Sequence, residues 1–178
     1  MKHYKLVKYK NTGDAGIKDF ICSEELKQRF YSGVKLSPTI NPKIVIENKS
    51  GKPQDFIMGG TALPIISKKV KELLLTLPES NKFEFISTNV ENLNSNTEYW
   101  VLNILDILDC VDFDKSEYRT YNNSEKIKRI DKLVFKEGAI NKDIFYLKDF
   151  PVDIYVSEKI ATLFNENDIT GYKLIDIE

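Results

Sequence analysis

The sequence predicts an α+β domain in which one mixed β-sheet of about six strands packs against about three helices. Three observations support this class. A long apolar segment lies near the middle of the chain, two similar strand–helix–strand segments lie on either side of it, and several short β-branched segments are separated by turn-forming residues. The elements are justified below from the central segment outward.

The central segment reads EYWVLNILDILDCVDFDKSE, from Glu98 to Glu117. Its first part, Tyr99–Leu105, is a nearly continuous apolar and aromatic run, which is typical of a strand buried on both faces. We therefore expect this run to be the central strand, with Trp100 buried. Four carboxylates then interrupt the apolar residues where the chain leaves the core: Asp106, Asp109, Asp112 and Asp114.

The first part of the chain contains two strand signals and one helix signal. Tyr4–Tyr9 alternates in a pattern that predicts a strand, and its lysines favour an edge position because they discourage pairing with another chain. Residues 11–16 form a turn. Ser23 is a helix N-cap followed by acidic residues, which predicts a short surface helix ending near Gly33. Lys43–Glu47 (KIVIE) is a further strand.

A strand–helix–strand segment follows. Leu63–Ile66 is a short extended entry, and Ser67 caps a helix that continues to about Leu77. Phe83–Ile86 then returns as a strand.

The same order of elements recurs near the C-terminus. Ile154–Val156 is extended, Ser157 caps a helix through about Asn165, and Tyr172–Ile177 returns as a strand. The two copies align as IISKKVKELL against YVSEKIATLF, with the serine, one lysine and the apolar positions in register. An internal duplication and two independent serine-capped helices both account for this match.

The remaining segments complete a single domain. Ile127–Phe135 and Ile144–Leu147 are predicted strands, and the polar residues 91–97 form a loop rather than a domain boundary. A chain of 178 residues that is 42% hydrophobic is long enough to bury one sizeable core. We therefore expect residues 1–178 to fold as one domain.

Charge and composition exclude several function classes. The 26 basic and 27 acidic residues give a net charge of -1, which disfavours binding to nucleic acid or to an anionic membrane. Cys22 and Cys110 belong to no CxxC pair, so we expect reduced thiols. The N-terminal residues MKHYKLVKYK do not resemble a signal peptide, and no apolar run reaches 18 residues. The expected location is the cytoplasm.

Motifs for catalysis are weak. The four aspartates after the central strand could act in a metal site or in acid–base catalysis, but they lack the spacing and glycine of an EF-hand. His3 is the only histidine and lies near a terminus, which disfavours Ser-His-Asp and Cys-His arrangements. Gly59 and Gly60 match no phosphate-binding loop. We expect no cofactor, no metal and no catalytic residues.

Two tyrosines are candidates for a protein interface. Tyr118 and Tyr121 lie in a polar stretch beside carboxylates, and exposed tyrosines in such surroundings are typical interface anchors. Packing of the same rings over a sheet edge is an equal alternative.

Several blocks of the sequence together resemble a family of bacterial immunity proteins. They are LNILDILD from Leu102 to Asp109, IFYLKDFP from Ile144 to Pro151, IYVSEKIATLF from Ile154 to Phe164, and DITGY from Asp168 to Tyr172. The chain is similar to the eleventh numbered family of polymorphic-toxin immunity proteins, formerly a domain of unknown function. The resemblance covers Leu63 to Ile177, and residues 1–62 carry no recognised motif.

The resemblance implies a cytoplasmic protein without enzymatic activity, encoded beside a secreted toxin, that neutralises this toxin by binding it. The cognate toxin domain would then be the partner, and we expect it to be bound by a short set of exposed side chains: Asp112, Asp114, Glu117, Tyr118 and Tyr121. The alternative is an enzyme of unrecognised type that uses the carboxylates Asp106, Asp109, Asp112 and Asp114. A deep pocket holding several of these carboxylates would favour the enzyme.

Overall fold

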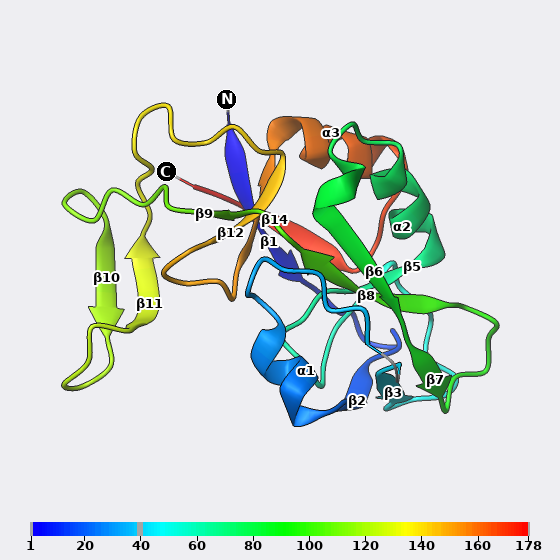
Figure 1. The fold of residues 1–178 in the computed structure, drawn as a ribbon. Helices are drawn as coiled ribbons and strands as arrows, with labels where there is room; N and C mark the ends of the chain where they lie inside the picture. The colour runs from blue at the N-terminus through cyan, green and yellow to red at the C-terminus, as the bar shows by residue number, and fades with distance from the viewer. Residues whose placement is uncertain (1, 39–40, 178) are drawn as a thin grey trace.

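A computed structural model describes residues 2–38 and 41–177. Its elements confirm the α+β class (Figure 1). The helices are α1 (Glu24–Arg29), α2 (Lys68–Leu75) and α3 (Glu158–Glu166), with a short 3-10 helix at Ser80–Lys82. The strands are β1 (His3–Lys8), β2 (Ile17–Ile21), β3 (Lys43–Ile46), β4 (Phe56–Ile57), β5 (Ile65–Ser67), β6 (Phe83–Ser87), β7 (Asn89–Glu91), β8 (Tyr99–Ile104), β9 (Ile107–Leu108), β10 (Glu117–Thr120), β11 (Ile127–Lys132), β12 (Ile144–Leu147), β13 (Ile154–Ser157) and β14 (Tyr172–Asp176).

The prediction of one mixed sheet is wrong. The described strands form four separate sheets, with the orders β14-β1-β13-β12-β9, β4-β5-β8-β6, β2-β3-β7 and β10-β11. The error has a physical cause. A strand that is apolar on both faces is expected in the middle of one broad sheet covered by helices, but the same pattern arises where small sheets stack face to face.

The central strand itself is confirmed. All six residues of β8 are buried, and β8 pairs with β5 on one side and with β6 on the other. Trp100, Leu102 and Ile104 face the helices, whereas Tyr99 and Val101 face the β2-β3-β7 sheet. Trp100 is 8% exposed, as expected.

The edge position expected for β1 is also wrong, because β1 lies between β13 and β14. Its lysines do not repel neighbouring strands, since each has a local partner. The Lys5 Nζ lies 2.5 Å from an Asp153 carboxylate oxygen, and the Lys8 Nζ donates hydrogen bonds to the carbonyls of Thr61 and Leu63.

The two similar segments of the sequence adopt the same topology. In the first unit, a β4–β5 hairpin leads through α2 to β6, and the antiparallel strand β8 lies between β5 and β6. In the second unit, a β12–β13 hairpin leads through α3 to β14, and the antiparallel strand β1 lies between β13 and β14. The register agrees as well, because Ser67 pairs with Tyr99 of β8 and Ser157 pairs with His3 of β1.

Both serine caps are confirmed, and each has an additional partner. The hydroxyl oxygens of Ser67 and Ser157 accept hydrogen bonds from the amides of Val70 and Ile160. In turn, Ser67 donates to Asp55 at 2.6 Å and Ser157 donates to Asp143 at 2.7 Å. Each aspartate immediately precedes the first strand of its unit, so the cap also fixes the hairpin to the helix.

Helix α1 is shorter than predicted and ends at Arg29 rather than near Gly33. The reason lies in the next two residues. Phe30 turns its backbone to an extended conformation and is buried, and Tyr31 has a φ of 69°. The chain therefore leaves the helix to insert Phe30 into the core. The predicted cap is present, because Ser23 accepts a hydrogen bond from Leu26.

Three apolar clusters hold these layers together. The first lies between α2, α3 and the helix-side faces of the two units, so that the two units share one core. The second lies between the first unit and the layer formed by β2, β3 and α1. The third lies between β12–β13 and the segment that precedes them. No helix of the described residues is long and apolar enough to cross a membrane.

Candidate functional site

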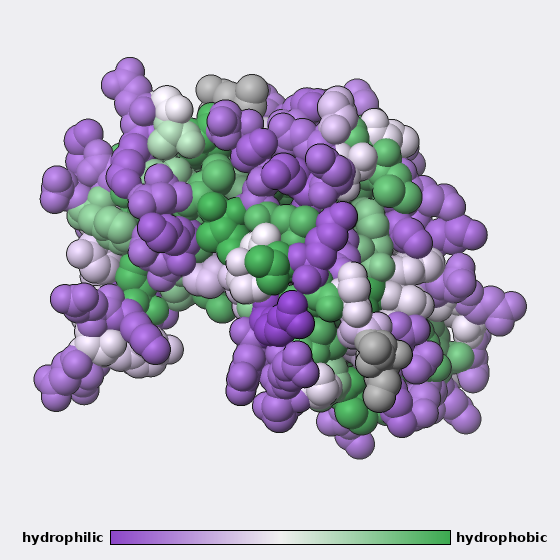
Figure 2. Space-filling view, viewed as in Figure 1, coloured by the Kyte–Doolittle hydropathy of each residue, from purple (hydrophilic) through white to green (hydrophobic). Residues whose placement is uncertain are grey.

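A β-hairpin stands out from the body of the molecule. Among the described strands, β10 and β11 pair only with each other (Figure 1). All four residues of β10 are exposed. We call residues 117–132 the arm. Figure 2 shows that the side chains of the arm are mainly hydrophilic, on the lower left of the view. Because an isolated two-stranded hairpin is marginally stable in water, the arm needs support from its base.

The base of the arm is fixed by both apolar and polar contacts. The Phe113 ring lies edge-on to Tyr118 with a centroid distance of 5.3 Å, and Ile130 packs on the cluster that contains Leu133. The Ser116 hydroxyl accepts a hydrogen bond from the Val134 amide at 2.9 Å. These contacts set the direction of the arm.

The arm is net basic, although the sequence prediction emphasised its carboxylates. It contains five basic residues, Arg119, Lys126, Lys128, Arg129 and Lys132, and three acidic residues, Glu117, Glu125 and Asp131. Asp131 lies within ion-pair distance of both Arg119 and Arg129. One of the three carboxylates of the arm is therefore neutralised locally.

The five predicted partner-binding residues lie on the arm or at its base. Asp114, Glu117, Tyr118 and Tyr121 are exposed, with the two tyrosines 41% and 54% exposed. Asp112 is half-buried and pairs with Lys115 at 2.9 Å, which lowers the pKa of its carboxyl. Its backbone carbonyl also accepts from the Ser116 amide, so Asp112 shapes the turn that starts the arm.

The four carboxylates of the enzyme alternative do not converge. Asp106 is buried beside Lys82 and Lys142, each 3.8 Å away. Asp109 is exposed and hydrogen-bonded to Lys136, which lowers the pKa of its carboxyl. Within residues 2–38 and 41–177, no group of three potential metal-ligating side chains could hold an ion. Asp106, Asp109 and Asp112 each pair with a different basic side chain, and this geometry offers no shared reaction centre.

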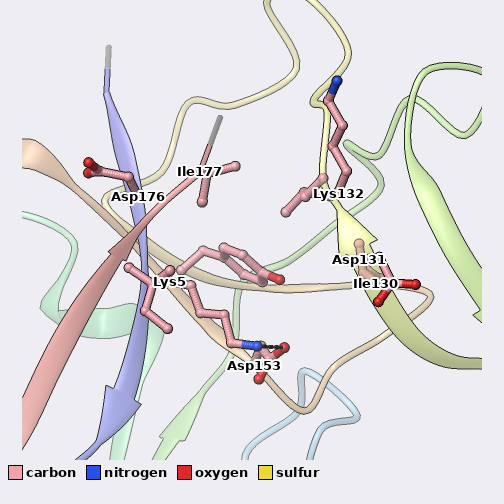
Figure 3. A pocket seen from close by; sticks show the side chains of 10 residues that line it. Lys5, Ile130, Asp131, Lys132, Asp153, Asp176 and Ile177 are labelled. Carbon is pink, nitrogen blue, oxygen red and sulfur yellow. Dashed lines mark hydrogen bonds and ion pairs between the residues drawn. The ribbon is translucent and has the colours of Figure 1, made fainter.

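A cleft of about 430 Å³ separates the arm from the second unit (Figure 3). Ile130, Asp131 and Lys132 of the arm line one side, and Lys5, Asp153 and Ile175 line the other. The Lys5–Asp153 ion pair crosses its floor. The cleft is therefore lined by both apolar and charged side chains.

Sequence reasoning did not select the floor of this cleft. Lys5 and Ile175 are directly opposite each other on β1 and β14, but they are far apart in sequence. The signal that could have found them is the internal similarity of the two units. Once β1 is known to lie between β13 and β14, as β8 lies between β5 and β6, this similarity assigns equivalent sheet positions.

Most of this arrangement falls within one known protein family. Residues 13–178 match the immunity protein family Imm11. The match includes residues 13–62, in which the sequence analysis recognised no motif. A search of curated proteins finds no match. Because the matched residues include the arm, the first unit with the layer that covers it, and all of the second unit except β1, the chain belongs to the Imm11 immunity protein family.

Proposed function

We propose that this protein acts in the cytoplasm, where it binds the toxin domain encoded beside it and thereby neutralises it. Membership of the immunity family supports the general role. The observation that carries the binding proposal is the arm, whose exposed tyrosines and charged residues project from a firmly anchored base. Tyrosine supplies a large contact area at a low cost in conformational entropy, so such side chains suit a docking surface.

The charge at the base of the arm bears on the rate at which the protein associates with the toxin. Asp114 and Glu117 are exposed, and neither forms an ion pair among the described residues. Unpaired carboxylates attract a basic surface over several ångströms and so accelerate association. We propose that they approach a basic region of the toxin.

Co-expression with the toxin domain encoded by the adjacent gene tests the function. Wild-type protein is expected to restore growth and to co-elute with the toxin. The double charge reversal Asp114→Lys/Glu117→Lys should slow association by about tenfold and weaken its dependence on salt. A matched control is Asp19→Lys/Glu166→Lys, which reverses two exposed carboxylates away from the arm. If the wild type neither protects cells nor binds the toxin, the proposed function is wrong.

A further inference from the structure

The shared topology of the two units allows their sheet positions to be compared one by one. A row of four residues crosses each sheet on the face opposite the helix. In the first unit it contains Ile57, Ile65, Val101 and Ile86, which are directly opposite one another on β4, β5, β8 and β6. In the second unit the equivalent row contains Phe145, Tyr155, Lys5 and Ile175.

The row of the first unit is completely covered. Its four side chains are between 0% and 4% exposed and belong to one apolar cluster with Ile44 and Ile46 of β3. A polar pair in the next row fixes part of this cover. The Glu84 carboxylate accepts from the Leu36 and Ser37 amides, and the Asn103 side chain donates to the Val34 carbonyl.

The row of the second unit is covered only in part. Phe145 and Tyr155 lie under Phe135 and are 0% and 2% exposed. Beyond them the cover stops, because the Lys5 side chain is 33% exposed and Ile175 is 50% exposed. Ile175 is thus an open apolar residue at the position where the first unit has the buried Ile86.

The open region continues past Asp153. A second hollow of about 340 Å³ is lined by Val7, Met58 and Val152, and it shares Asp153 with the cleft beside the arm. Val152 and Met58 are 43% and 44% exposed. We call the region formed by Lys5, Val7, Val152, Asp153, Lys173 and Ile175 the uncovered face.

Charge indicates what could cover this face. Lys173 of β14 occupies the position equivalent to Glu84 of β6. Each lies two residues before the member of its strand that belongs to the compared row, Ile175 or Ile86. The Lys173 ammonium lies over the Tyr9 ring and, among the described residues, forms no ion pair with a carboxylate. Lys132, on the arm side of the cleft, likewise forms no ion pair within the described part of the chain. Asp153 and Asp176, in contrast, are paired with Lys5 and Lys2. Among the described residues that line the cleft and the uncovered face, the charges left for a partner are therefore positive.

We propose that the toxin supplies the missing layer by placing an extended, apolar and acidic segment on the uncovered face. Apolar side chains of this segment cover Ile175 and Val152, and its carboxylates meet Lys173 and Lys132. The arm forms one wall of the same docking surface. This inference rests on the proposed function, and it assigns the acidic part of the toxin to the uncovered face and the basic part to Asp114 and Glu117.

The test measures the affinity of the purified adjacent toxin domain for the full chain and for single variants. Ile175→Glu and Lys173→Glu are each expected to weaken binding by about tenfold or more, because each places a carboxylate against an acidic, apolar segment. A photo-crosslinking amino acid at position 175 should form a covalent product with the toxin.

Matched controls come from α2, outside the uncovered face. Leu75→Glu alters a residue that is also 50% exposed, and Lys69→Glu reverses an exposed lysine on the same helix. Both should leave affinity within about twofold, and a crosslinker at position 75 should give no product. Thermal unfolding of each variant confirms that it is folded.

The outcomes separate the two proposals. Wild-type affinity for Ile175→Glu and Lys173→Glu, or no crosslink at position 175 in a complex that forms, would overturn the uncovered face as the docking site while leaving the immunity function in place. Failure of the wild type to bind the toxin at all would overturn both.

Discussion

Lys8 is a charged residue that the fold places in an unfavourable environment. Its Nζ donates to the carbonyls of Thr61 and Leu63 at 2.6 and 2.9 Å, and burial lowers the pKa of this amine to about 8. In the unfolded chain the amine keeps its ordinary, higher pKa. Between pH 8 and about 10.5 the unfolded state therefore binds more protons than the folded state, so this group makes stability rise with pH.

The first prediction concerns this rise of stability with pH. Relative to Lys8→Met, the wild-type protein should gain up to about 3 kcal/mol of unfolding free energy as pH rises from 7.5 to 10.5. The comparison with the variant removes the contributions of groups that both proteins share. Urea unfolding at several pH values measures this difference, and a difference that is constant with pH would contradict the lowered pKa of Lys8.

The serine caps give a second prediction. Ser157→Ala removes both the hydrogen bond accepted from Ile160 and the hydrogen bond donated to Asp143, so it should cost about 1 to 2 kcal/mol of unfolding free energy. Ser67→Ala removes the equivalent pair and should cost a similar amount. The exposed Ser95→Ala serves as the control, with an expected change below about 0.5 kcal/mol. Equal stability of all three variants would show that the caps contribute nothing.

At the scale of elements, shortening the arm tests its role in binding independently of the stability of the fold. Tyr118 and Ile130 are directly opposite each other on β10 and β11, so residues 119–129 can be replaced by a two-residue Asn-Gly turn. The anchoring contacts of Phe113, Tyr118 and Ile130 remain in this variant. The shortened protein should therefore unfold within a few degrees of the wild type.

The same variant should lose protection against the adjacent toxin, because Tyr121 and most of the charged residues of the arm are gone. Growth in co-expression and a thermal melt measure the two properties in parallel. Full protection by a stable, shortened protein would place the toxin contact elsewhere on the surface.

Most elements could be predicted from local sequence, but their pairing could not. Ser67 and Ser157 mark helix starts, and the apolar run at Tyr99 marks a buried strand, because capping and burial leave a local pattern. The two-residue strands β4 and β9 leave no such pattern. The floor of the cleft could not be predicted from the sequence for another reason. The exposure of Ile175 depends on segments, distant in the sequence, that cover the first unit but not the second.

At the scale of the whole molecule, the two units differ in which part of the chain supplies the central antiparallel strand, β8 in the first unit and β1 in the second. In the first unit β8 follows β6 along the chain, whereas in the second unit β1 is supplied from the N-terminal part. Because Tyr4 and Asp176 are directly opposite each other, a short linker could connect β14 to β1 as a hairpin. Both units would then have the same order of elements.

A circular permutant tests this equivalence. Its ends are joined by about four Gly/Ser residues, and its new termini lie between the exposed residues Ser95 and Asn96. We expect a cooperative fold with a melting temperature within about 5 °C of the wild type, since no sheet pairing is cut. A control permutant opened between Ile65 and Ile66, inside β5, should unfold. Loss of folding in the first permutant would show that the connection between β6 and β8 is essential.

The position of β1 also has a consequence during synthesis. This strand leaves the ribosome well before its neighbours β13 and β14, so that on the order of ten seconds pass before pairing can begin. The first unit can fold meanwhile, because its strands lie close together in sequence. β1 remains an unpaired strand with apolar residues until β13 and β14 emerge. Lys5 and Lys8 interrupt its apolar residues and Lys2 and Lys10 flank it, the arrangement that typically guards an apolar strand of a nascent chain against aggregation.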